Sequence, residues 1–127
     1  MFIDGASKGN PGKAGIGIVI YNERGEKIRE VSKSIGITTN NVAEYVSLIF
    51  ALQEALILNC RGEITIYTDS ELLYKQVKGL YRVKNDNLKI LSQLTQHLIA
   101  GYEKFEIEHI GRDSNKVADK LATQAIK

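Results

Sequence analysis

The stretch MFIDGASKGNPGKAGIGIVIY, residues 1–21, decides how the chain begins to fold. It reads as a short strand over residues 1–7, a turn at Lys8–Gly12 and an apolar, β-branched strand over residues 15–21. NERGE then turns the chain into a third strand over residues 27–35, in which VSKSI alternates. Three consecutive strands with short connections predict an antiparallel meander.

After the meander the hydrophobic period changes. Tyr45, Leu48 and Leu52 follow the spacing of an amphipathic helix, and TTNN at residues 38–41 supplies its start signal. Further strands are expected over residues 63–69 and 104–110. The other helices are expected at Ser70 to Lys78, from about Asn87 to Ala100, and from about Asn115 to the end.

Strands that alternate with helices favour parallel crossovers. We therefore predict an α/β fold with one mixed five-stranded sheet, made of the antiparallel meander and two parallel strands, with helices on both faces. A length of 127 residues predicts a single domain over residues 1–127. Cys60 is the only cysteine, which excludes an internal disulfide, and no apolar run approaches the ~20 residues of a membrane span. We expect a cytoplasmic monomer with no membrane partner.

The net charge of +2 does not indicate a nucleic-acid binder, but its distribution is uneven. Residues 75–89, called the basic segment below, carry five bases and one acid, which gives +4. Such a patch could meet a polyanion. The alternative is an ordinary solvated helix and loop surface.

Asp4 stands in the first expected strand with no charged neighbour before Lys8. Asp4-Gly5 is a hairpin signal, but only three residues precede it and KGNPG is a better turn. If this strand is central, burying an unpaired carboxylate is costly. Asp4 therefore needs a cation or a set of hydrogen-bond donors.

Three more acids stand in similar places, each with an ordinary alternative. Glu44 shares a helix face with Leu48 and Ala51 and so points inward, although the helix dipole also favours an acid in a first turn. Asp69 ends a strand, where ligands bind in open α/β sheets, or it caps the next helix. Asp119 lies beside the apolar stripe of the last helix, or is a plain surface acid.

The four acids argue more strongly together. If the Asp4 strand is central and pairs in parallel with the Asp69 strand, both carboxylates emerge at the same end of the sheet, and the helix start at Glu44 can reach it. Converging carboxylates repel unless a cation neutralises them. Oxygen ligands without a His/Cys cluster favour Mg²⁺, with Mn²⁺ as a substitute, over zinc. Because Mg²⁺ leaves positions open for phosphate oxygens, the pattern points toward phosphodiester chemistry.

Four segments carry a family resemblance: DGASKGNPG (4–12), TTNNVAE (38–44), YTDS (67–70) and HIGRDSNKVAD (109–119). Their order and approximate spacing resemble the type 1 ribonuclease H (ribonuclease HI) family over nearly the whole chain. The resemblance implies a ribonuclease H-like fold and an endonuclease that hydrolyses the RNA strand of RNA/DNA hybrids. It also implies two metal ions at the scissile phosphate, products with a 5′ phosphate and a 3′ hydroxyl, and four metal-binding, catalytic acids: Asp4, Glu44, Asp69 and Asp119.

The same resemblance assigns a basic residue in the loop before the last helix. His109 falls ten positions before Asp119, where the family usually has a histidine that assists proton transfer or product release. Arg112 falls seven positions before Asp119, where some members use an arginine. We prefer His109, and the alternative that it only ends a strand stays open.

Small polar residues match the family's hybrid contacts, and such groups suit the 2′-hydroxyls and base edges of a shallow minor groove. Asn10, Asn40 and Asn41 would contact the groove, and Thr39 would contact a phosphate. Asn85 is a looser match to another phosphate contact, and Gly5 would let the backbone approach a sugar.

The chain also departs from larger family members, which carry a Trp- and Lys-rich protrusion between two central helices. Here the corresponding stretch KGLYRVKND is short and the chain has no Trp, so weaker substrate binding is expected, with the basic segment as a partial substitute. Two other hypotheses remain. One is a non-catalytic nucleic-acid-binding module on this fold, which would not need four acids. The other is a transposase-like or junction-resolving nuclease, which would lack the NPG and TTNN elements.

Overall fold

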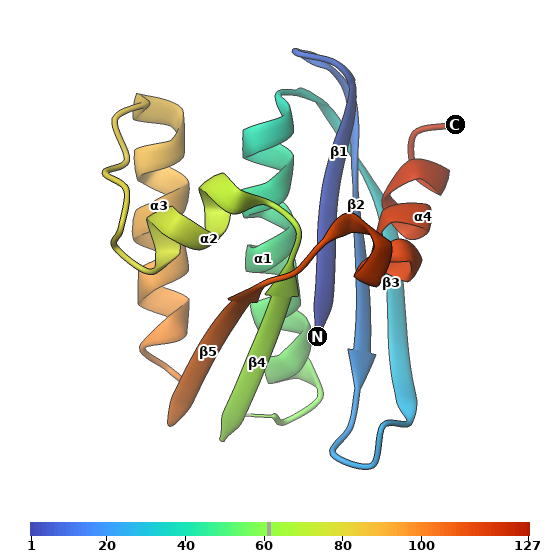
Figure 1. The fold of residues 1–127 in the computed structure, drawn as a ribbon, viewed down its shortest axis with the longest axis vertical. Coiled ribbons are helices and arrows are strands. Elements are labelled where there is room, and N and C mark those ends of the chain that lie inside the picture. Colours follow the sequence, from blue (N-terminus) through green and yellow to red (C-terminus); the bar gives the residue numbers. More distant parts are fainter. Residues whose placement is uncertain (61) are drawn as a thin grey trace.

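Five strands and four α-helices build the protein, in a computed structural model that describes residues 1–60 and 62–127 (Figure 1). The strands are β1 (Phe2–Gly9), β2 (Gly12–Tyr21), β3 (Lys27–Thr38), β4 (Glu63–Thr68) and β5 (Lys104–His109). The helices are α1 (Asn40–Ile57), α2 (Glu71–Val77), α3 (Asp86–Ile99) and α4 (Lys116–Gln124), and a short 3-10 turn, η1 (Arg112–Ser114), precedes α4. The predicted order of elements is confirmed.

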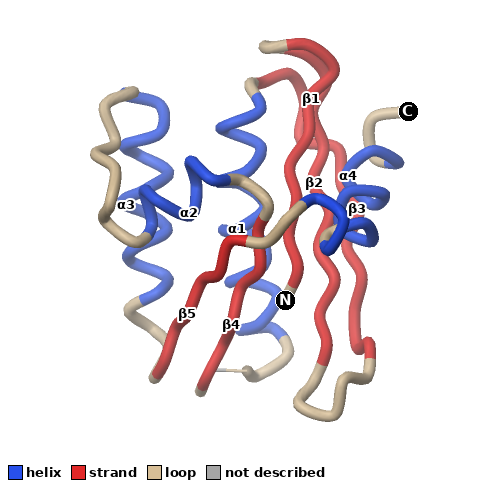
Figure 2. The backbone as a smooth tube through the Cα atoms, in the orientation of Figure 1, coloured by secondary structure: helices blue, strands red, loops and turns tan. Residues whose placement is uncertain are grey.

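The strands form one sheet in the order β3-β2-β1-β4-β5, with β1 at its centre (Figure 2). β1, β2 and β3 pair antiparallel, whereas β4 pairs in parallel with β1 and with β5. In Figure 1, α1, α2 and α3 lie to one side of the central strand and α4 to the other. The predicted α/β fold with a mixed five-stranded sheet is therefore confirmed.

Several predicted boundaries differ from the observed ones: β1 and β3 are longer than predicted, and α4 is shorter. The β1–β2 ladder continues beyond the predicted strand ends at residues 7 and 15 to the pair Gly9 and Gly12, so only Asn10 and Pro11 form the connecting turn. β3 continues to Thr38, because a bulge between the pairs Gly15–Ser34 and Ala14–Gly36 lets the ladder resume. Gly36 has a φ of 88°, a value that glycine adopts readily. At the chain's other end, α4 stops at Gln124 instead of reaching the last residue.

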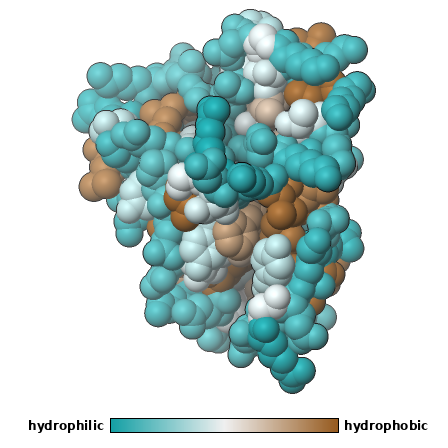
Figure 3. Space-filling model, turned by 45° about the vertical axis from the view of Figure 1, so that its right-hand side comes forward, coloured by the Kyte–Doolittle hydropathy of each residue, from teal (hydrophilic) through white to brown (hydrophobic). Residues whose placement is uncertain are grey.

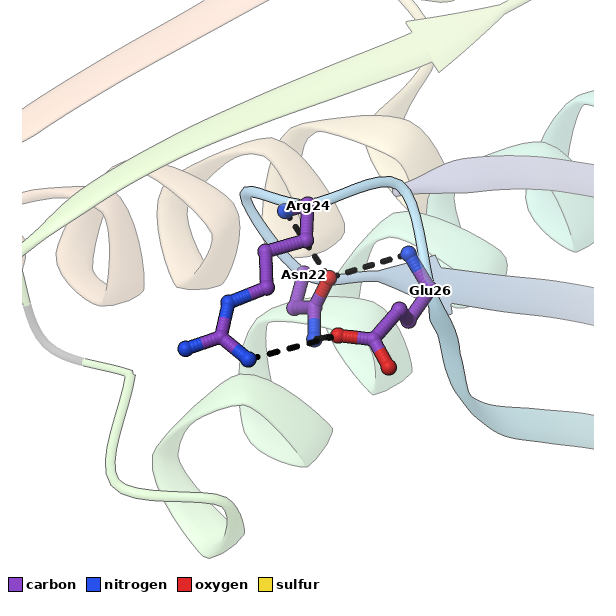
Figure 4. Close-up of polar contacts among 3 residues, drawn as sticks. All are labelled: Asn22, Arg24 and Glu26. Carbon is purple, nitrogen blue, oxygen red and sulfur yellow. Dashed lines mark hydrogen bonds and ion pairs between the residues drawn. The ribbon is translucent and has the colours of Figure 1, made fainter.

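The predicted NERGE turn between β2 and β3 is confirmed, and one side chain organises it (Figure 4). The Asn22 Oδ1 accepts hydrogen bonds from the backbone N–H groups of Arg24 and Glu26, both at 2.9 Å. The Arg24 guanidinium lies 3.9 Å from the Glu26 carboxylate. An Asx-type turn of this kind fixes where β3 begins.

The core lies mainly between the sheet and α1. Fully buried side chains from β2, α1 and β4 fill it, including Ile16, Ile18, Leu48, Leu52 and Ile66. The outer surface is mostly hydrophilic with interrupted apolar patches on the face shown in Figure 3. Among the described residues, no helix is both long and apolar enough to cross a membrane.

Candidate active site

Asp4 and Asp69 lie where the central strand parts from its parallel neighbour. The β1–β4 ladder ends at the pair Ile3 and Thr68, so Asp4 and Asp69 are the next residues along the two strands. Asp4 is only 5% exposed, and Asp69 is half-buried. The alternative that Asp69 caps α2 is wrong, because the Ser70 side chain accepts the capping hydrogen bond from the Leu73 N–H at 3.2 Å.

Glu44 reaches the same place from the first turns of α1. Thr39 caps this helix through a hydrogen bond from the Val42 N–H at 3.3 Å, which places Glu44 on the side that faces β1. Its Oε1 accepts a hydrogen bond of 2.7 Å from the Gly5 N–H. A Cβ on Gly5 would lie 2.3 Å from the carbonyl carbon of Ala43, so only glycine lets α1 come this close. Gly5 thus serves helix packing, and its predicted contact with a sugar stays a prediction.

Asp119 arrives from the opposite face of the sheet on α4. A Cβ on Gly17, the residue paired with Asp4 in the β1–β2 ladder, would lie 2.1 Å from the Ala118 carbonyl oxygen. Glycine at this position therefore allows α4 to pack directly on β2. The exposed carboxyl of Asp119 lines the same pocket as Asp4.

The carboxyl groups of the pocket lie close enough together to affect one another's pKa. Carboxylate oxygens of Asp4, Glu44 and Asp69 all lie within 4.8 Å of one another. Burial is the main cause that raises the pKa of Asp4 to about 9, and the three other carboxyl groups raise it further, Asp119 partly through a hydrogen bond. Burial also raises the pKa of Glu44 to about 8, against the lowering effect of the Gly5 N–H. A divalent cation would relieve this repulsion, and an all-oxygen donor set suits Mg²⁺ or Mn²⁺.

The acids line an open, polar pocket of about 390 Å³. Its other lining residues come from β1, the start of α1, the start of α2 and the loop before α4: Gly5, Ala6, Ser7, Asn40, Asn41, Ser70 and Arg112. The segments singled out in the sequence thus meet at one end of the sheet.

Comparison with known proteins decides the family. Residues 2–125 match the family described as reverse transcriptase-like. Ribonuclease H from Syntrophotalea carbinolica is 35% identical over 141 residues, which cover 99% of this chain and 89% of that protein. The chain belongs to the ribonuclease H family.

Two further relatives place the chain within the ribonuclease H family. Ribonuclease HI from Halobacterium salinarum is 36% identical over 125 residues, which cover 98% of this chain but only 62% of that longer protein. LC11 ribonuclease H1, isolated from compost, has a crystal structure in complex with an RNA/DNA hybrid. That structure has a TM-score of 0.93 and 40% identity to this chain, and it covers 98% of this chain and 94% of its own.

The two candidate bases of the ribonuclease H loop take different positions. Arg112 lines the acid pocket, and its guanidinium lowers the pKa of Glu44 against the effect of burial. His109 ends β5, and its ring stacks on Tyr74 with centroids 5.9 Å apart. His109 is not among the residues that line the pocket.

The asparagines expected to contact a hybrid are oriented by the protein. The Asn40 Oδ1 accepts hydrogen bonds from the Ser7 N–H at 3.0 Å and from the Ser7 hydroxyl at 3.1 Å. The Asn10 Oδ1 accepts from the Asn40 N–H at 3.0 Å. With both oxygens engaged, the amino groups of Asn10 and Asn40 are left as donors toward a ligand.

The remaining predicted contacts are less closely associated with the pocket. Asn41 is exposed and lines the pocket, whereas Thr39 caps α1 and is not among the residues that line the pocket. Asn85 lies elsewhere, at the start of α3, where its Oδ1 accepts from the N–H groups of Asn87 and Leu88. A phosphate contact by Thr39 or Asn85 stays a prediction.

Sequence analysis missed three residues that shape this candidate site: Ser7, Gly17 and Asn115. Ser7 orients Asn40, and Gly17 brings α4 onto the sheet. Glycine inside an apolar strand is a signal of close backbone approach and could have revealed Gly17. Asn115 lies in the segment 109–119 and at the expected start of the last helix, but neither pattern indicates that its side chain contacts Asp69.

Proposed function

We propose that this protein is a metal-dependent endonuclease that hydrolyses the RNA strand of RNA/DNA hybrids. The observation that carries the proposal is the convergence of Asp4, Glu44 and Asp69, with carboxylate oxygens within 4.8 Å, in a chain of the ribonuclease H family. The crystal structure of LC11 ribonuclease H1 with an RNA/DNA hybrid supports the substrate class. A purely binding module would have no use for this repulsive cluster.

Asp4, Glu44 and Asp69 would hold the metal, with Asp119 at the edge of the site. The fit is supported by the raised pKa values of Asp4 and Glu44. When no cation is bound, protons neutralise these carboxyl groups, and a bound cation would take the place of the protons. When bound there, Mg²⁺ supplies positive charge to a phosphodiester and favours deprotonation of water. A count of two ions, and products with a 5′ phosphate and a 3′ hydroxyl, belong to the same proposal.

The chain's own polar groups would orient the hybrid. The amino groups of Asn10 and Asn40 would donate to 2′-hydroxyl oxygens and base-edge acceptors, because their amide oxygens are already engaged by the protein. Asn41, at the rim of the same pocket, would extend this row of donors. This surface would therefore bind hydrogen-bond acceptors on the substrate rather than donors.

Arg112 would serve as the basic residue of the loop in place of His109. Its guanidinium lines the acid pocket, where it can stabilise negative charge on a phosphate. The stacking of His109 on Tyr74 supports the structural alternative for the histidine. This proposal reverses the preference drawn from the sequence.

One cleavage assay tests the proposed function. The purified chain is incubated with an RNA/DNA hybrid, a DNA duplex and an RNA duplex of the same sequence, each with Mg²⁺, Mn²⁺ or EDTA. We expect internal cuts in the RNA of the hybrid only, and only with metal, with ends that carry a 5′ phosphate. Binding of the hybrid without cleavage in either metal would support the binding module, and cleavage of the DNA duplex would support the transposase-like alternative.

A further inference from the structure

Asn115 stands at the position that precedes α4, where an asparagine ordinarily caps a helix with its side-chain oxygen. It does not do so here, because no side-chain capping hydrogen bond forms at this helix start. In α1, α2 and α3 the corresponding residues Thr39, Ser70 and Asn85 all cap their helices. Helix capping by the side chain therefore does not explain why an asparagine stands at position 115.

Its side chain instead turns inward and is 1% exposed. The Nδ2 donates to the Ile3 carbonyl oxygen at 2.9 Å and to the Asp69 Oδ2 at 3.2 Å. The Asn115 carbonyl accepts from the Asp119 N–H at 3.1 Å. One residue thus connects Asp69, the residue before Asp4, and the turn of α4 that carries Asp119.

The amide can adopt only one orientation. If it were flipped, the Oδ1 would face a carbonyl oxygen and a carboxylate, which are both acceptors. In the observed orientation the Oδ1 is buried and has no hydrogen-bond partner among the described residues. An unpaired buried acceptor is unfavourable, and leucine would fill a similar volume without it. The two hydrogen bonds of the Nδ2, to the Ile3 carbonyl and to the Asp69 carboxylate, are what the asparagine provides at this position.

We propose that Asn115 is a positioning residue for the metal-binding carboxylates. Its Nδ2 holds the Asp69 carboxylate in the orientation that faces Asp4 and Glu44, and it fixes the start of α4 against β1. The inference rests on the proposed function, because it assigns a role within the same site. Hydrogen bonds to ligating carboxylates of this kind set the affinity for a metal.

The test compares two buried hydrogen bonds to backbone carbonyls. Asn115→Leu removes the amide at similar volume, and Tyr102→Phe removes the hydroxyl that donates to the Leu52 carbonyl, far from the acids. Metal binding is measured without substrate, as the rise of Tm with increasing Mn²⁺ or Mg²⁺ concentration. Turnover and KM are then measured on the RNA/DNA hybrid.

We expect Asn115→Leu to raise the metal concentration at half-effect about ten-fold and to lower kcat by a similar factor, with KM for the hybrid unchanged. Tyr102→Phe should lower Tm while it leaves the metal midpoint and kcat as in the wild type. A metal midpoint and kcat that stay at wild-type values in Asn115→Leu would overturn the inference. Asn115→Ala, judged by the same criteria, replaces Asn115→Leu if leucine prevents folding.

Failure of the inference and failure of the proposed function look different in this experiment. If the wild type shows neither cleavage nor a metal-dependent rise in Tm, the proposed function itself is wrong. If the wild type shows both and Asn115→Leu matches it, only the positioning role of Asn115 is wrong.

Discussion

The acid pocket and the basic segment concentrate charge in opposite ways. In the pocket, Asp4 is 5% exposed, and Glu44 and Asp69 are held by N–H donors from Gly5 and Asn115. In the basic segment, three of the five bases, Lys78, Arg82 and Lys84, are exposed and form no ion pair among the described residues. The other two are partly neutralised, because Lys75 lies 2.7 Å from Glu71 and Lys89 lies 3.7 Å from Asp86.

Buried charges and exposed charges therefore have different consequences for function. Burial makes the charged forms of Asp4 and Glu44 costly, so the fold must fix their neighbours, and the pKa values of these two groups rise to about 9 and about 8. Exposed lysines cost little in any arrangement, because water screens them. The pocket therefore should act on turnover and the basic segment on binding, and the following variants test that division.

The largest effect is expected from Asp69→Asn. It removes one of the three converging carboxylates and should lower hybrid cleavage on the order of a thousand-fold, because the metal loses a ligand. The metal-free Tm should stay equal or rise, since like-charge repulsion falls. The control is Glu63→Gln, an exposed acid at the other end of the same strand, which should keep full activity. Wild-type cleavage by Asp69→Asn would end the metal-site assignment.

The next largest effect should separate the two loop bases. Arg112→Ala should lower kcat about ten-fold or more with little change in KM, because the guanidinium lies in the acid pocket. His109→Ala should change kcat less than about three-fold and lower Tm slightly, through loss of stacking on Tyr74. Steady-state kinetics at saturating Mg²⁺ measure both, and Arg112→Lys tests whether charge alone suffices. A larger loss of kcat in His109→Ala would restore the preference drawn from the sequence.

The sequence predicted the elements and the convergence of the acids because both depend on local or topological rules. The change of hydrophobic period located α1, and parallel pairing placed Asp69 beside Asp4 at the end of the sheet. Helical spacing predicted the inward direction of Glu44, which the hydrogen bond from Gly5 confirms.

What the sequence did not predict depends on contacts between distant residues. Asn115 bonds to residues 46 and 112 positions away, and nothing in its immediate neighbours indicates either contact. Arg112 and His109 stand three positions apart, and only the path of the loop through η1 places one of them in the pocket. The length of β3 depends on a bulge at Ile35, between Ser34 and Gly36, which the alternation of VSKSI does not indicate.

A smaller effect is expected of Asp4→Asn on the pH dependence of Tm. Asp4 and Glu44 have folded-state pKa values above their ordinary ones, so the stability they contribute is complete below about pH 4 and is lost as pH rises toward 8 to 9. In EDTA, the wild-type Tm should therefore fall relative to that of Asp4→Asn by a few degrees between pH 6 and pH 9. The Met1 amine, whose pKa burial lowers to about 6, acts in the opposite direction but cancels in this comparison.

Added Mg²⁺ should reduce the fall in wild-type Tm relative to Asp4→Asn between pH 6 and pH 9, because the cation replaces the protons at high pH. Thermal melts at four pH values, with EDTA and with Mg²⁺, measure both effects. Parallel curves for the wild type and Asp4→Asn in EDTA would contradict the raised pKa of Asp4.

The smallest effect should come from the basic segment. Replacing Lys78, Arg82 and Lys84 with glutamine removes the three bases of the segment that pair with no acid in the described part of the chain, and sparing Lys75 keeps its contacts with Glu71 and Tyr81. KM for the hybrid should rise about three- to ten-fold at low salt, and its salt dependence should flatten, because fewer counterions are released on binding. Turnover at saturation should change less than about two-fold. A control with equal charge loss replaces Arg24 in the β2–β3 turn, Lys27 at the start of β3 and Lys104 at the start of β5.

The control separates a local contact from the net charge of the chain. If both triple variants raise KM equally, the hybrid responds only to total charge and the basic segment has no special role. If neither changes the salt slope, the hybrid is held elsewhere, and Lys8 and Lys13 beside the turn that carries Asn10 become the next bases to replace. If saturated turnover collapses while KM is unchanged, the basic segment reaches the reacting phosphate. In that case, the division between a buried site for turnover and an exposed surface for binding is wrong.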